Sequence, residues 1–263
     1  MQYKITRYSS LLNKITSDDK LFRGNYTLDP YQNCEFGCLY CDSYSDNTIY
    51  VKSNADIILE KQLQNIKKGV IIIGSVDDPY QKAEEKYRIT RKLLTVIKKN
   101  DFPCHILTKS DLIVRDIDII SKINNCIVTM SILSLNNSNA KIFEKNVPSP
   151  MIRLKTVKKL SKNGIKTGIA VIPLLPFIVE EELEDIVRSA YEHKAHYILY
   201  KYLELKGDQR HVFLEKLKIF HPELMNRYEK LYKDSYIPDE DYITKMNSTL
   251  SSLCKKYCIK NKI

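Results

Sequence analysis

The chain has 263 residues, of which 43% are hydrophobic, so it can bury the core of one α/β domain or of two small domains. It has no apolar run long enough to span a membrane and no apolar secretory signal, and its seven cysteines, an odd number, favour a reducing cytoplasm over a disulfide framework. The formal net charge of +10 favours contact with a polyanion such as nucleic acid, although a solvated lysine-rich surface has the same charge.

Strand and helix patterns alternate along the chain after a polar lead-in at residues 1–20. Short apolar or β-branched runs predict six strands, at residues 21–28, 70–74, 104–108, 127–131, 165–172 and 197–200. Apolar residues at helical spacing predict helices around residues 57–66, 93–97, 117–123, 154–160 and 183–187. Because alternating strands and helices are typical of a parallel sheet with helices outside it, we expect an open, partial (β/α)6 barrel.

The last part of the chain, residues 205–263, is predicted to be mainly helical. One packed face is indicated by Leu214, Leu217, Phe220 and Leu224. Pro238 followed by three acidic residues indicates the start of a further helix. We therefore expect a partial barrel over residues 1–204 and a helical C-terminal extension over residues 205–263 that packs on the barrel.

Three cysteines close together, Cys34, Cys38 and Cys41, give the strongest chemical signal. Thiolates are the usual ligands of iron–sulfur clusters, and three of them would leave one iron of a four-iron cubane open. On an α-helix the three would share a face as small hydrophobes, but they would spread over roughly 10 Å, at about 1.5 Å per residue. Gly37 within the triplet and Asn33 before it indicate instead a loop that can curl around a 4Fe-4S cluster.

Polar residues follow several predicted strands, where chemistry collects in parallel barrels. Asp77 follows the second strand and could accept from an ammonium or a ribose hydroxyl, although a plain strand-to-helix turn uses the same residue type. Lys109 follows the third strand and could pair with a carboxylate or remain solvated. Ser131 ends the fourth strand. Arg153 could bind a carboxylate through two N–H groups of its planar guanidinium, or it could lie on the surface.

The cysteine triplet, with the aromatic Tyr40 just before its third cysteine, resembles the radical S-adenosylmethionine (SAM) superfamily. The order of the later motifs is similar to the spore photoproduct lyase-like branch of that superfamily, which includes a DNA-repair enzyme. Those motifs are Cys41–Ser43, Asp77–Gln81, Thr108–Ser110, Arg115–Asp116, Ser131, Glu144, Pro148, Arg153, Gly164, Pro173–Pro176 and His221–Glu223. The resemblance extends from about residue 22 to residue 250.

The resemblance implies a cofactor pair and a role for each motif. Cys34, Cys38 and Cys41 would ligate a 4Fe-4S cluster whose open iron chelates SAM. An electron from the cluster would then cleave SAM to a 5′-deoxyadenosyl radical that abstracts hydrogen from a substrate. The resemblance further implies a flavodoxin- or ferredoxin-type electron donor.

The resemblance also assigns the residues around SAM. Tyr40 would touch the adenine region through its backbone, while Asp77, Lys109 and Ser131 would line the methionine or ribose end. Arg153 is a further candidate for this site, and no residue is assigned to catalysis itself.

Two departures from the lyase pattern bear on the substrate. The lyase has a hydrogen-donating cysteine after its second strand, where this chain has Gly74 and Ser75. Asp42 replaces the tyrosine that follows the cluster motif.

A nucleic-acid-related substrate is our leading hypothesis, and a peptide or small molecule is the alternative. An iron–sulfur electron carrier or a cluster-dependent binding protein is a third hypothesis, which requires a fourth ligand from Cys104, Cys126, Cys254 or Cys258.

Overall fold

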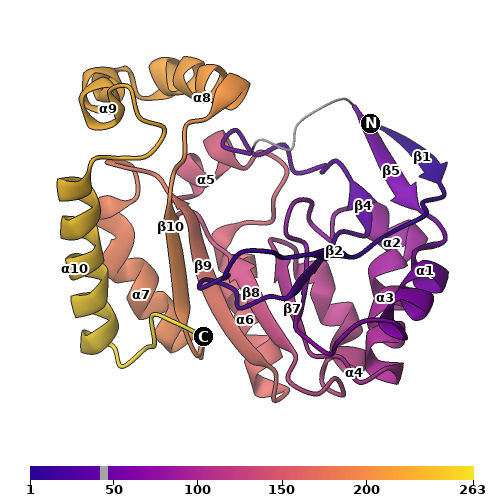
Figure 1. Ribbon diagram of the computed structural model, residues 1–263. Coiled ribbons are helices and arrows are strands. Elements are labelled where there is room, and N and C mark those ends of the chain that lie inside the picture. The colour runs from indigo at the N-terminus through magenta and orange to yellow at the C-terminus, as the bar shows by residue number, and fades with distance from the viewer. Residues whose placement is uncertain (42–46) are drawn as a thin grey trace.

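A seven-stranded sheet forms the centre of the protein, seen in a computed structural model that describes residues 1–41 and 47–263 (Figure 1). The strand order is β10-β9-β8-β7-β6-β3-β2. Six of these strands are parallel and follow chain order, and β2 is antiparallel at one edge. Their bounds are β2 (Asn13–Lys14), β3 (Tyr26–Leu28), β6 (Ile71–Ile73), β7 (Cys104–Thr108), β8 (Ile127–Ser131), β9 (Lys166–Leu174) and β10 (Ile198–Tyr202). The predicted partial (β/α)6 barrel is confirmed.

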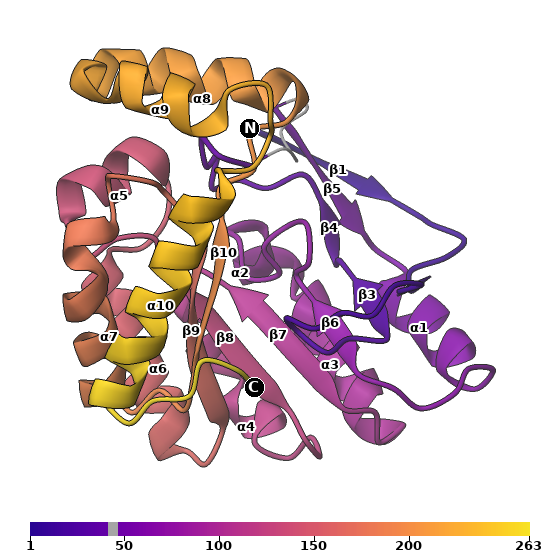
Figure 2. The same ribbon diagram turned by 60° about the vertical axis from the view of Figure 1, so that its left-hand side comes forward.

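Helices cover the outer face of the sheet, as Figure 2 shows from the side. They are α1 (Ala55–Leu63), α2 (Ala83–Tyr87), α3 (Ile89–Lys99), α4 (Ile117–Ile120), α5 (Asn137–Phe143), α6 (Pro150–Lys162) and α7 (Leu183–Glu192), with short 3₁₀ turns at Asp111–Asp116 and Glu180–Glu182. The α3 helix shows why they pack there, because its apolar residues recur on one face and are buried at Ile89, Leu93, Leu94 and Ile97. The strands between the layers have apolar runs such as Ile71–Ile73, in which every residue is buried.

The first predicted strand is shorter than expected, because residues 21–25 form a turn instead. The Asp19 carboxylate accepts hydrogen bonds from the backbone N–H groups of Leu21, Phe22 and Gly24 at 3.0–3.1 Å. This segment between β2 and β3 crosses the inner face of the barrel (Figure 1). Leu21 and Phe22 pack there against a small cluster of buried residues, Ala170, Tyr197 and Leu199.

Residues 1–20, predicted as a polar lead-in, are mostly exposed, but part of this segment is paired in a second sheet. This sheet has the order β1-β5-β4, from β1 (Gln2–Thr6), β5 (Thr48–Lys52) and β4 (Tyr31–Gln32). The β1 strand pairs in parallel with β5 along its whole length. Four of its five residues are exposed, so its sequence lacks the alternation that marks a half-buried strand.

The C-terminal part is mainly helical, as predicted, with α8 (Gly207–Phe220), a 3₁₀ turn (Pro222–Leu224), α9 (Met225–Tyr232) and α10 (Glu240–Lys256). Its core-facing side differs in one position, since Phe213 is buried while the predicted Phe220 is 48% exposed. The α10 helix packs against α7 and contributes Met246 and Leu250 to the main core. The division at residue 204 stays a prediction.

No helix in the described part of the chain combines the length and the apolar character that crossing a membrane requires.

Candidate active site

The cysteine loop has no helical residues between Asn33 and Cys41, so the loop prediction is confirmed. Two residues in it have a left-handed backbone, Gly37 at φ 59° and Asn33 at φ 69°. These turns curl the chain, and the N–H of Cys41 donates to the carbonyl of Cys38 at 3.1 Å. All three cysteines are half-buried and line one cavity.

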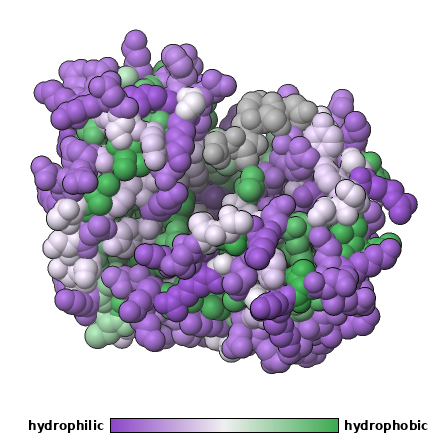
Figure 3. Space-filling model, viewed as in Figure 1, coloured by the Kyte–Doolittle hydropathy of each residue, from purple (hydrophilic) through white to green (hydrophobic). Residues whose placement is uncertain are grey.

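The cavity lies at the carboxyl ends of the central parallel strands, where a partial barrel collects chemistry. Its walls come from the cysteine loop and from the ends of β6, β7, β8 and β9. Figure 3 shows the surface hollowed beside the lobe formed by α8 and α9. Of the predicted site residues, the structure brings six into the lining: Cys34, Cys38, Tyr40, Cys41, Lys109 and Ser131.

Lys109 supplies a positive charge to this cavity. Burial alone would lower the pKa of its ammonium. The Cys38 sulfur, which is anionic once it ligates a metal, and the Glu144 and Asp78 carboxylates together raise the pKa by more, so the ammonium stays charged. Its Nζ lies 5.9 Å from the centre of the Tyr40 ring. Among the described residues no carboxylate forms an ion pair with it, so the charge is available to a bound anion.

Ser131 supplies a polar atom that lacks a partner. Its Oγ is buried and makes no hydrogen bond within the described chain, although it lines the cavity. Buried hydroxyls normally have a hydrogen-bond partner, so an orphaned one that faces a cavity indicates a place for a polar ligand atom.

Arg153 does not line the cavity but lies fully buried behind it. Its guanidinium donates to the Glu144 carboxylate and to the Ser131 carbonyl, both at 2.7 Å. The Tyr40 hydroxyl also donates to the Glu144 carboxylate. Burial, together with the nearby Cys38 and Glu144, raises the pKa of Tyr40, which therefore remains a neutral donor. Arg153 thus positions the cysteine loop and the end of β8 rather than touching a ligand.

Asp77 also lies outside the lining, and its neighbour Asp78 is on the cavity wall in its place. Burial and the Asp29 carboxylate raise the pKa of Asp77 to about 7, against the opposing effect of a hydrogen bond from the Asn33 backbone. The Asp78 carboxylate accepts from the Thr108 hydroxyl at 2.7 Å and from the backbone N–H of Lys109 at 2.6 Å. Asp78 therefore ties the ends of β6 and β7 together.

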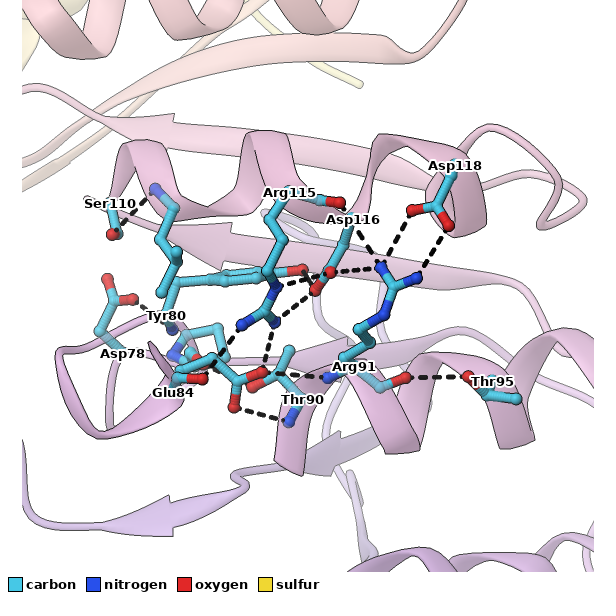
Figure 4. A network of polar contacts seen from close by, with 12 residues as sticks. Asp78, Tyr80, Glu84, Thr90, Arg91, Thr95, Ser110, Arg115, Asp116 and Asp118 are labelled. Atoms are coloured by element: carbon cyan, nitrogen blue, oxygen red, sulfur yellow. Dashed lines mark hydrogen bonds and ion pairs between the residues drawn. The ribbon is translucent and has the colours of Figure 1, made fainter. Parts of the chain in front are cut away.

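A second polar network fixes the segment after β6 from behind (Figure 4). Arg115 donates to the buried carboxylates of Glu84 and Asp116 at 2.6 and 2.8 Å, and Arg91 donates to Asp116 at 2.7 Å. The Tyr80 hydroxyl donates to Asp116 at 3.1 Å. Tyr80, Arg115 and Asp116 belong to the motifs that resemble the lyase-like branch. They bind one another and Glu84, not the cavity, so they support the cavity wall from outside.

The lining residues that sequence reasoning missed include Phe22, Phe36 and Thr129. Thr129 had a usable signal, because it precedes Ser131 by two residues on one strand and so shares its face. Phe22 had none, since its position depends on the Asp19 turn. The Cys41–Ser43 motif and the Asp42 departure extend into residues 42–46, which lie outside the described chain.

The fold and the site define a class. The Radical SAM superfamily model matches residues 28–190, so the chain belongs to the radical SAM superfamily. The protein is a radical SAM enzyme, built as a partial barrel with the cysteine loop at the carboxyl ends of its strands.

The sequences of two curated relatives align with most of this chain. The chain is 27% identical to an uncharacterized protein of Mycobacterium tuberculosis over 270 residues, which cover 94% of this chain and 78% of the relative. It is 30% identical to an uncharacterized protein of Methanocaldococcus jannaschii over 193 residues, which cover 69% of this chain and 73% of the relative.

Solved structures share the fold. A spore photoproduct lyase complexed with dinucleoside spore photoproduct is similar at a TM-score of 0.74 and 16% identity, covering 97% of this chain and 79% of that one. A lyase variant with bound AdoMet and the same dinucleoside has a TM-score of 0.76. Streptococcus suis SuiB bound to S-adenosylmethionine is similar at a TM-score of 0.52 and 16% identity, covering 75% of this chain and 47% of that one.

The residues of the cavity fit the cofactors that the superfamily implies, a 4Fe-4S cluster and SAM. Three thiols line one wall, as cluster ligation requires. The Lys109 ammonium and the Ser131 hydroxyl, neither of which forms a hydrogen bond or ion pair with a side chain within residues 1–41 and 47–263, match the charged and polar groups of SAM. No three His, Cys, Asp or Glu side chains of residues 1–41 and 47–263 are grouped to hold a single metal ion, and a cubane differs in binding each thiolate through a different iron.

Proposed function

We propose that Cys34, Cys38 and Cys41 hold a 4Fe-4S cluster and that the enzyme uses it to act on a nucleic-acid-related substrate. The observation that carries the cofactor assignment is the convergence of three thiols, one unpaired ammonium and one orphaned hydroxyl on a single cavity. When bound, the cluster supplies the electron that cleaves SAM to a 5′-deoxyadenosyl radical, and that electron comes from a flavodoxin- or ferredoxin-type donor.

The residues of the chain bind and orient SAM. The Lys109 ammonium receives the SAM carboxylate, since it remains charged and has no competing ion pair in the described chain. The Ser131 hydroxyl donates to or accepts from a ribose or methionine group. The buried Arg153 and Glu144 keep both Tyr40 and the end of β8 in position.

The nucleic-acid part of the proposal rests on two observations. A solved structure with a similar fold is a lyase complexed with a dinucleoside spore photoproduct, and the chain has a net charge of +10. Gly74 and Ser75 contribute to the cavity wall where the lyase resemblance leads one to expect a hydrogen-donating cysteine. Among the described lining residues, the thiols are those of the three cluster ligands alone. We therefore propose a nucleic-acid-related reaction in which no separate thiol quenches the product radical.

The test is an anaerobic assay of the reduced, cluster-loaded protein with SAM, with and without dinucleotide spore photoproduct. We expect slow formation of 5′-deoxyadenosine without substrate. With spore photoproduct, we expect absent or uncoupled release of thymidylyl thymidine, with side products. A loaded protein that forms no 5′-deoxyadenosine would contradict SAM cleavage, and clean multiple-turnover repair would contradict our reading of Gly74 and Ser75.

A further inference from the structure

The lining of the cavity contains two residues that the cofactor assignment does not use, Phe22 and Thr129. We propose that they form a nucleobase subsite, in which a planar heterocycle stacks on the Phe22 ring and donates an N–H hydrogen bond to Thr129 Oγ1. This inference rests on the proposed function and narrows its substrate to one that presents an accessible base. Each half of the subsite is fixed by contacts of its own.

Phe22 is held by a rigid turn. The Asp19 carboxylate accepts three backbone N–H bonds, from Leu21 at 3.1 Å and from Phe22 and Gly24 at 3.0 Å. A Cβ atom on Gly24 would lie 2.3 Å from the Ile72 side chain, so only glycine lets the turn approach β6 this closely. The loop therefore presents the Phe22 ring at a fixed place with little entropy left to lose on binding.

His105 orients the same ring from the barrel interior. The two rings meet edge to face, with centroids 5.6 Å apart and planes 73° apart. Burial lowers the pKa of His105 to about 4, so the imidazole is neutral. Its Nδ1 lies 3.3 Å from the Phe22 carbonyl, which can only accept, so Nδ1 carries the hydrogen. Nε2 is then an acceptor.

This tautomer sets the direction of the bonds at Thr129. The Thr129 hydroxyl lies 2.6 Å from His105 Nε2 and must donate its single hydrogen to it. The Tyr197 hydroxyl lies 2.6 Å from Thr129 Oγ1 and 3.3 Å from the Val128 carbonyl. Because the only hydrogen of Thr129 goes to His105, the hydrogen in the shorter contact comes from Tyr197, and Thr129 Oγ1 accepts it. One lone pair remains on Oγ1, and Thr129 lines the cavity although it is only 1% exposed. Thr129 is thus an acceptor without a hydrogen to offer, which selects a ligand with an N–H or O–H donor.

A nucleobase satisfies both halves at once. Every base has a flat face for an aromatic ring, and stacking of this kind tolerates sequence differences. The imide of thymine or uracil and the exocyclic amines of the other bases supply the N–H donor. A phosphate group would use neither half, because it has no flat face and no N–H.

The test compares two single-stranded probes of equal length, labelled oligothymidylate and an abasic oligomer with the same phosphates. Binding to the cluster-loaded protein is measured by fluorescence anisotropy. We expect the parent protein to prefer oligothymidylate, and Phe22→Ala to weaken its binding by about fivefold to a hundredfold while binding of the abasic oligomer changes little. Phe22→Tyr should keep the preference. Phe220→Ala, which removes an exposed aromatic ring outside the cavity, is the matched control.

Thr129 gives a second, independent comparison. Thr129→Val removes the hydroxyl at nearly constant shape and should lower the preference, whereas Thr129→Ser should restore it. Iron content and the unfolding midpoint verify that each variant is folded. Retained preference in both Phe22→Ala and Thr129→Val would overturn the subsite while the proposed function stands. A parent protein that binds neither probe would overturn the nucleic-acid substrate and the subsite together.

Discussion

The thiols of Cys34 and Cys38 lie in surroundings that oppose ionisation. Burial, followed by the Asp78 carboxylate, raises the pKa of Cys34. Burial raises the pKa of Cys38 to about 12, although the Lys109 ammonium acts in the opposite direction. Because ligation requires thiolates, loading iron must release protons.

The cluster assignment predicts the behaviour of single cysteine variants. Replacing Cys38 with alanine should abolish bound iron and the visible absorption of anaerobically reconstituted protein, because a cubane with two protein ligands is not held. Cys254→Ala is the control, since Cys254 is buried in the C-terminal helix α10. A normal iron content in Cys38→Ala would refute the three-ligand assignment.

Lys109 carries the second residue-level prediction. Lys109→Ala should weaken SAM binding by about 1.5–3 kcal/mol, the usual contribution of a hydrogen bond to a charged group. Lys166→Ala removes an exposed lysine at the start of β9, the opposite end of the barrel, and should leave the affinity unchanged. Isothermal titration of loaded protein with SAM measures both. Equal affinities in the parent and Lys109→Ala would show that this ammonium does not bind the cofactor.

At the scale of elements, strand ends were predictable and the links between them were not. Lys109 and Ser131 follow apolar runs directly, so their location on the cavity follows from the barrel pattern alone. Arg153 lies on α6 and its partner Glu144 follows α5, and nothing in the spacing of nine residues shows that both are buried together. Fully buried charges depend on a partner that only the tertiary structure supplies.

The Arg153–Glu144 pair predicts a stability effect. Arg153→Met should lower the free energy of unfolding by about 3–5 kcal/mol, because it leaves the buried Glu144 without its cation. Denaturant titration of the anaerobic protein measures the loss. Arg188→Met breaks an ion pair whose side chains are about half exposed, and should cost less than about 1 kcal/mol. Similar losses in the two variants would show that the buried pair has no special role.

At the scale of the whole molecule, the parallel barrel could be predicted because its strands are buried on both faces and read as continuous apolar runs. The β1-β5-β4 sheet could not, because its strands are short or exposed and its pairing joins residues 2–6 to residues 48–52. The residues that cover the inner face of the barrel could not be predicted from the sequence either. The turn that lays Phe22 across it depends on backbone bonds to Asp19, which leave no periodic pattern.

The net charge of +10 predicts how a polynucleotide should bind to the whole protein. A protein that neutralises Z phosphates of a single strand releases counterions, so the logarithm of affinity should fall with the logarithm of salt at a slope of about −0.7Z. Anisotropy titrations of oligothymidylate from low to physiological salt give this slope. The abasic oligomer carries the same phosphates and should give a parallel line, displaced only by the loss of base contacts. Salt-independent binding, or no binding to either strand, would contradict a nucleic-acid substrate and would favour a peptide or a small molecule in this cavity.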